Sequence, residues 1–73
     1  MKARQKLQQI ADEVDGELRV SYSGCGMYGK TCLGIVCEDP DTVKKMANEE
    51  KITGACQDSM GLDYIVYWPK IKE

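Results

Sequence analysis

Four cysteines carry the greatest potential for chemistry in this sequence. Cys25, Cys32, Cys37 and Cys56 include no CxxC pair, and the chain has no histidine that could complete a mixed ligand set. Structural zinc sites mostly use closely spaced ligand pairs, so the pattern predicts no metal site. We expect Cys37 and Cys56 to be small core residues because they lie in apolar runs. Cys25 and Cys32 flank a glycine-rich loop, so we expect both to be accessible. If the protein meets an oxidant, we expect these two cysteines to form the first disulfide.

The glycine-rich loop Gly24–Thr31 is the second candidate site, because it matches the G-x-x-x-x-G-K-T pattern of phosphate-binding loops. That chemistry requires a helix that begins at Lys30-Thr31, so that its amides and dipole hold the phosphates. The residues that follow, 32–37, contain a glycine and β-branched side chains and predict a strand instead. We therefore interpret the loop as a hairpin connection. A weaker alternative is that its amides and Lys30 hold an anion.

Two large side chains, Met27 and Tyr28, lie between the glycines of this loop. Loops on rigid scaffolds often carry function, and tyrosine is a frequent anchor at protein interfaces. One interpretation is that this pair contacts a partner. The other is that Tyr28 folds back over the edge of its own sheet.

Composition narrows the classes of function. The 73 residues suffice for one small domain, 1–73, with a thin core. The net charge is −2, which argues against a dedicated nucleic-acid-binding protein, and the absence of histidine excludes Ser-His-Asp and Cys-His catalysis within one chain. No apolar run approaches the length of a membrane span, and the polar start is not typical of a signal peptide, so we expect a cytoplasmic protein with free thiols.

Hydrophobic periodicity predicts two helices and four strands. A helix with one apolar stripe is expected over 2–15, ending at Gly16, and a second helix is opened by Asp39 as N-cap with Pro40 behind it. Strands are expected over 17–23, about 32–38, about 52–57 and about 63–68, with a turn over 58–61. The order α-β-β-α-β-β predicts an α+β fold in which a four-stranded sheet carries both helices on one face. The strand order does not follow from the sequence.

The last strand is apolar on both faces, with Tyr64, Val66 and Trp68 on one and Ile65 and Tyr67 on the other. Helices on only one side of the sheet should leave one of these sets exposed. A patch of this kind usually marks a partner surface. The predicted face of the first strand toward the helices is formed by Leu18, Val20 and Tyr22. The candidate partner-binding residues are Met27, Tyr28, Lys30, Tyr64, Val66 and Trp68.

Two segments of the sequence resemble a known group of proteins. Residues 23–29, S-G-C-G-M-Y-G, and residues 58–69, D-S-M-G-L-D-Y-I-V-Y-W-P, resemble small uncharacterised proteins encoded by bacteriophages. Cys25 stands where that group more often has arginine, which weakens the idea of a basic binding loop. The resemblance implies a small accessory protein, in the cytoplasm of the host cell, that binds a host or viral macromolecule.

The sequence therefore predicts a non-catalytic protein-interaction module without a cofactor, whose partner is another protein or a second copy of the chain. The alternative is a protein that binds a small ligand, nucleotide or anion through Gly24–Thr31. A third hypothesis is a metal or redox protein that uses the four cysteines.

Overall fold

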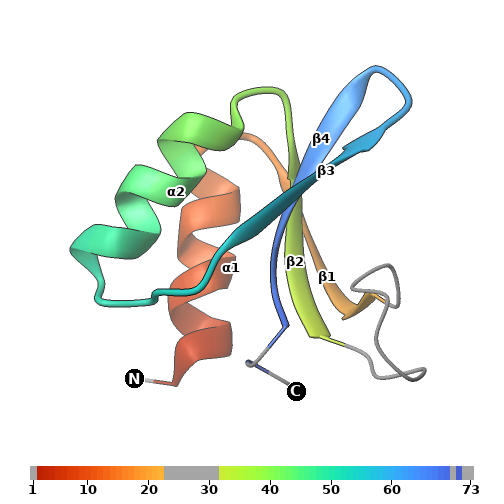
Figure 1. The fold of residues 1–73 in the computed structure, drawn as a ribbon. Helices are drawn as coiled ribbons and strands as arrows, with labels where there is room; N and C mark the ends of the chain where they lie inside the picture. The colour runs from red at the N-terminus through yellow and green to blue at the C-terminus, as the bar shows by residue number, and fades with distance from the viewer. Residues whose placement is uncertain (1, 23–31, 70, 72–73) are drawn as a thin grey trace.

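The computed structural model describes residues 2–22, 32–69 and 71 (Figure 1). The elements in chain order are α1 (Ala3–Glu13), β1 (Glu17–Tyr22), β2 (Cys32–Cys37), α2 (Pro40–Glu49), β3 (Cys56–Met60) and β4 (Asp63–Trp68). The predicted α+β class and the order α-β-β-α-β-β are confirmed. Within the described part of the chain, no helix is both long and apolar enough to cross a membrane.

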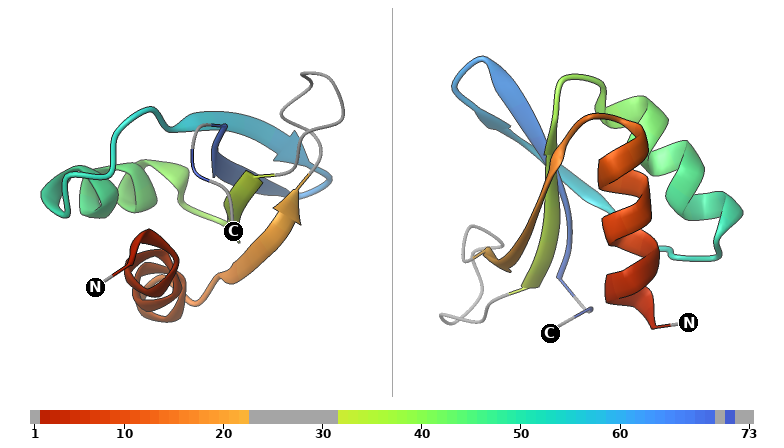
Figure 2. Two further views of the ribbon diagram at one scale, coloured as in Figure 1. Left: turned by 90° about the horizontal axis from the view of Figure 1, so that it is seen from below. Right: turned by 180° about the vertical axis from the view of Figure 1, so that it is seen from behind.

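The strands form one sheet in the order β1-β2-β4-β3, and each neighbouring pair is antiparallel. Both helices cover the same face of this sheet, as the views from below and behind show (Figure 2). We call this the inner face and the opposite one the outer face. Ile35 of β2 lies between Leu18 of β1 and Val66 of β4, so the middle of the inner face is apolar on three adjacent strands.

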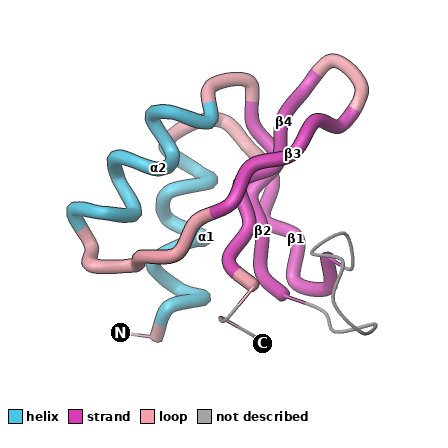
Figure 3. The backbone as a smooth tube through the Cα atoms, in the orientation of Figure 1, coloured by secondary structure: helices cyan, strands magenta, loops and turns pink. Residues whose placement is uncertain are grey.

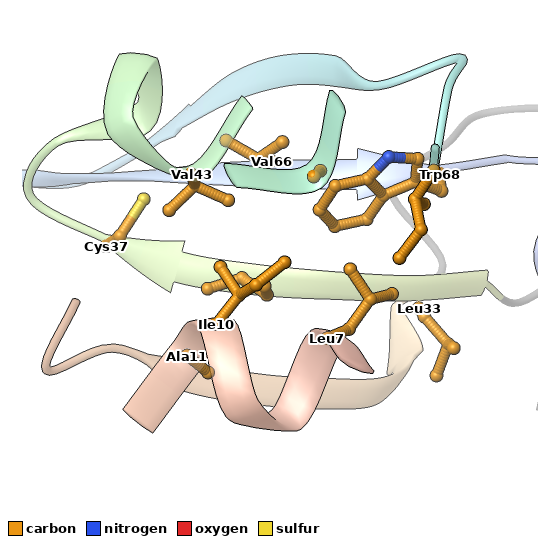
Figure 4. Close-up of a cluster of buried hydrophobic side chains, with 11 residues drawn as sticks. Leu7, Ile10, Ala11, Leu33, Cys37, Val43, Val66 and Trp68 are labelled. Atoms are coloured by element: carbon orange, nitrogen blue, oxygen red, sulfur yellow. The ribbon is translucent and has the colours of Figure 1, made fainter. Parts of the chain in front are cut away.

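The core fills the space between the helices and the inner face (Figure 4). Leu7, Ile10 and Ala11 of α1 lie three and four positions apart, which places them on one side of the helix. The charges of α1 oppose its dipole, with no acidic residue in its first turn and no basic residue in its last. Its apolar packing therefore has to hold it in place. The buried cluster consists of Leu7, Ile10, Ala11, Leu33, Ile35, Cys37, Val43, Ala47, Ile52, Val66 and Trp68.

The helix ends agree with the predictions except in one detail. Asp39 caps α2 as expected: its carboxylate accepts hydrogen bonds from the Thr42 amide and hydroxyl, which lowers the pKa of Asp39. At the end of α1, however, Asp15 and not Gly16 has the left-handed conformation, with φ of 57°. Gly16 is required for a different reason, because a Cβ there would lie 2.5 Å from the Val36 carbonyl oxygen. This close approach lets the chain turn from α1 directly into the sheet.

The third strand begins later than predicted. The expected strand 52–57 is wrong in its first half, because Ile52 closes the end of α2 by donating its amide to the Ala47 carbonyl and is buried in the core. Gly54, with φ of 86°, then redirects the chain. The predicted turn 58–61 is largely strand, and Gly61 and Leu62 alone connect Met60 to Asp63. Figure 3 shows that the resulting β3–β4 hairpin projects away from the helices.

Candidate functional site

The structure separates the predicted partner-binding residues into three groups. Met27, Tyr28 and Lys30 lie outside the described residues. Tyr64 is 39% exposed, and its role as a partner contact stays a prediction. Val66 and Trp68 have no exposed surface at all, so their prediction as partner contacts is wrong.

The register of β4 explains why Val66 and Trp68 are buried. Trp68 lies opposite Leu33 and Val66 opposite Ile35, all on the inner face beneath the helices (Figure 4). Alternation identified the two faces of β4 correctly, but it gave no means of deciding which face the helices cover. Trp68 is thus the largest fully buried side chain, and its Nε1 has no hydrogen-bond partner.

The outer face of the sheet contains the other set, but it is not an open apolar patch. Ile65 has no exposed surface, although no helix covers it. It is accommodated by Gly34 on the neighbouring strand, where an added Cβ would lie 2.9 Å from Ile65 Cδ1 and 3.2 Å from Tyr67 Cβ. The absence of a side chain at Gly34 therefore leaves room for the Ile65 side chain on the outer face.

Tyr22 also lies on the outer face, because the pairing of β1 with β2 changes register before this residue. The pairing with β2 is irregular between Arg19 and Tyr22, and such a bulge reverses the face on which later side chains lie. The predicted placement of Tyr22 with Leu18 and Val20 is therefore wrong. Its ring contacts Tyr67, with centroids 5.1 Å apart and planes at 51°, a geometry that aromatic pairs favour.

Polar contacts hold this tyrosine pair in place. The Tyr22 hydroxyl donates to Oδ2 of Asp58 on the far strand β3 at 3.5 Å. Burial raises the pKa of the Tyr22 phenol, and the nearby Asp58 carboxylate and Tyr67 raise it further. We call these contacts between Tyr22 of β1, Tyr67 of β4 and Asp58 of β3 the clasp.

The cysteines are distributed differently from the predictions at two positions. Cys37 is buried on the inner face as expected, and burial raises the pKa of its thiol, with Asp39 and Asp63 as further contributors. Cys32, expected to be accessible, is fully buried and donates its thiol to the Tyr22 carbonyl at 3.5 Å. Cys56, expected in the core, is exposed on β3. Cys25 lies outside the described residues, so the predicted Cys25–Cys32 pairing stays a prediction.

The hairpin tip is where large apolar side chains meet solvent. Leu62 is 101% exposed, and Tyr64 two residues later is partly exposed. Gly61, with φ of 65°, occupies the first position of the loop, the place that a type II′ turn reserves for glycine. This two-residue connection joins β3 directly to β4, whose other end is buried in the core.

Acidic side chains surround the base of the hairpin. A shallow hollow of about 210 Å³ is lined there by four acidic residues, Asp15, Glu17, Glu38 and Asp63, together with Gly16, Val36 and Cys37. In the part of the chain that the structure describes, no three acidic or cysteine side chains are arranged to hold a metal ion. We call Leu62, Tyr64 and these carboxylates the hairpin end.

The phosphate-binding interpretation of Gly24–Thr31 can be compared with the structure at one point. Residues 32–37 form β2, as predicted, so the residues immediately after Lys30-Thr31 are not helical. The loop itself lies outside the described residues. Binding of an anion by the amides of this loop therefore stays a prediction. The helix that a P-loop requires does not follow the loop, because β2 begins at Cys32.

No protein-family model matches the chain, and neither does any curated protein or any solved structure.

Sequence reasoning missed Leu62 because it placed the turn at 58–61, before this residue. A signal was available in Gly61-Leu62, which separates two runs that pair as strands. It also missed the Tyr22–Tyr67 contact, for which the glycine inside the second strand was the available signal.

Proposed function

We propose that this protein is a non-catalytic interaction module that binds another protein through the hairpin end. The observation that carries the proposal is the complete exposure of Leu62 on a rigidly connected hairpin. A leucine in a hairpin loop adds nothing to the core, whereas a glycine or asparagine would suit the turn equally well. Leucine at this position is therefore better explained by a contact with a partner.

The fold supports such a role mechanically. One end of β4 is fixed in the core by Val66 and Trp68. Its other end, near the partly exposed Tyr64, continues into the hairpin loop with Leu62, and the β3–β4 hairpin projects away from the helices (Figure 1). A contact residue on a preorganised element loses little conformational entropy on binding. The resemblance to small bacteriophage proteins would make the partner a host or viral protein. We propose a cytoplasmic location, a compartment in which thiols stay reduced.

The alternative, binding of a small ligand, nucleotide or anion by Gly24–Thr31, stays open as a prediction. No described residue supports it, since the strand β2 takes the place of the helix that would orient a phosphate. Isothermal titration with ATP and inorganic phosphate distinguishes it from the interaction module. Micromolar binding that is lost in Lys30→Ala would favour the alternative.

The proposed function is tested by affinity capture from the source cell, followed by mass spectrometry, with three baits. The wild-type chain should retain a specific protein that Leu62→Ser does not. Gln9→Ser is the matched control, because Gln9 is exposed on α1, remote from the hairpin, and should capture the protein normally. Equal capture by Leu62→Ser and wild type would contradict the proposal.

A further inference from the structure

We infer that the partner of the hairpin end is a basic, amphipathic segment of another protein, with lysine or arginine side chains arranged around an apolar recess. This inference rests on the proposed function and specifies the chemistry of its partner. Two independent features carry it, namely the isolated apolar tip and the segregation of charge around its base.

The charge segregation is strong for so small a chain. Of the twelve acidic residues in the sequence, five belong to the segments that meet at the hairpin end, and these segments contain no lysine or arginine. The segments are the α1–β1 connection with the first residue of β1, the β2–α2 connection and the start of β4, and Figure 1 shows them at the same end of the molecule. The five residues are Asp15, Glu17, Glu38, Asp39 and Asp63.

These carboxylates are mostly not used by the fold. Asp39 caps α2, but no ion pair joins Glu17, Glu38 or Asp63 to another described residue. The ion pair between Lys6 and Glu50 lies at the opposite end of the helices. Like charges placed close together weaken a fold, so their accumulation here is explained by an external cation better than by stability.

The same charges exclude a second copy of this chain as the occupant. A symmetric dimer places the same patch of both subunits in contact. A dimer through the hairpin end would bring two sets of these carboxylates together without a counter-charge. Nucleic acid and an anionic membrane surface are disfavoured for the same reason, since both present negative charge. A basic protein surface is the occupant that complements this charge.

The geometry suggests how the two features would act together. Leu62 would enter an apolar recess of the partner, while Glu17, Glu38 and Asp63 pair with surrounding cations at the rim. Buried apolar anchors supply most of the affinity of such contacts, and rim charges mainly accelerate association and select the partner. The inference therefore predicts two separable effects, one on affinity from Leu62 and one on salt dependence from the carboxylates.

The test uses fluorescence anisotropy with a short synthetic amphipathic peptide of lysine and leucine as the probe. Two related peptides serve as comparisons, one with glutamate in place of lysine and one with serine in place of leucine. The protein variants are Leu62→Ser and the double variant Glu17→Gln/Glu38→Gln. Glu49→Gln/Glu50→Gln is the matched control, because it removes the same charge from exposed residues at the far end of α2.

We expect the wild type to bind only the lysine–leucine peptide well. Leu62→Ser should weaken binding about tenfold, the usual effect of losing an apolar anchor. Glu17→Gln/Glu38→Gln should weaken it about threefold to tenfold and reduce its salt dependence, while the control double variant should bind like the wild type.

Three results would overturn the inference. They are the absence of peptide binding by the wild type at low salt, equal binding of the glutamate peptide, and an equal loss in the two double variants. Each leaves the proposed function intact if Leu62→Ser still loses its captured protein. Conversely, normal capture by Leu62→Ser would overturn the proposed function whatever the charge variants do.

Discussion

The outer face of the sheet and the hairpin end both carry large apolar side chains that are not part of the core beneath the helices, but these side chains differ in exposure. On the outer face, Ile65 is buried beside Gly34, and Tyr22 contacts Tyr67. At the hairpin end, Leu62 is wholly exposed. Ile65 has a neighbouring strand on each side, with Val36 of β2 and Asp58 of β3 opposite it. Leu62 instead lies in the two-residue connection between β3 and β4, where no strand pairs with it.

This comparison shows that an apolar strand face is not by itself a binding surface. Ile65 has no exposed surface although no helix covers it, and the neighbouring Gly34 leaves room for its side chain. The side chain most available to a partner is instead Leu62, in the loop that connects β3 and β4. The free energy of unfolding tests this distinction, because substitutions should lower it strongly in the core, moderately on the outer face and little at the hairpin tip.

The largest effect is expected for Trp68→Ala. Removing a fully buried tryptophan typically costs about 3–5 kcal/mol, which is a large share of the stability of a small domain. Urea denaturation followed by circular dichroism should show a variant that is mostly unfolded or close to it. Trp68→Phe should lose much less, because Nε1 makes no hydrogen bond and the remaining ring still fills most of the space. A stable Trp68→Ala protein that only fails to bind would mean that Trp68 is a contact residue after all.

A smaller but clear loss is expected for Gly34→Val on the outer face. The first added carbon alone would lie 2.9 Å from Ile65 Cδ1, so Ile65 or the strands must shift. Overpacking of this kind costs about 1–3 kcal/mol. Val36→Thr, at a half-buried position on the same face, is the control for a change in strand side chain without a clash. An unchanged midpoint of unfolding for Gly34→Val would show that the outer face is loosely packed.

A modest effect that depends on pH is expected for Tyr22→Phe. At neutral pH the loss should stay below about 1 kcal/mol, because the bond to Asp58 is long. The folded-state pKa of Tyr22 is raised above its ordinary value of 10.0, so its contribution is present below pH 10.0 and is lost as the pH rises through the folded value. The difference in melting temperature between wild type and variant should therefore shrink in alkaline buffer. A difference that grows with pH would contradict the assigned clasp.

The smallest effect on stability is expected for Leu62→Ser. Because Leu62 is fully exposed, its replacement should change the free energy of unfolding by no more than about 0.5 kcal/mol. The same denaturation measurement checks this, and the result also validates the variant for the binding experiments. A loss comparable to that of Gly34→Val would show that Leu62 contributes to the fold, and the hairpin end would then lose its strongest argument.

The sequence by itself determined the features that depend on neighbours along the chain. The apolar stripe of α1, the cap at Asp39 and the alternation in β4 were correctly predicted, because each is set by residues within a few positions. The tertiary structure alone decided which side of β4 the helices cover and on which face Tyr22 lies. The first depends on helices distant in sequence, and the second on a bulge that only the pairing of β1 with β2 defines. Leu62 became a candidate contact for the same reason, since exposure is fixed by what the rest of the fold leaves uncovered.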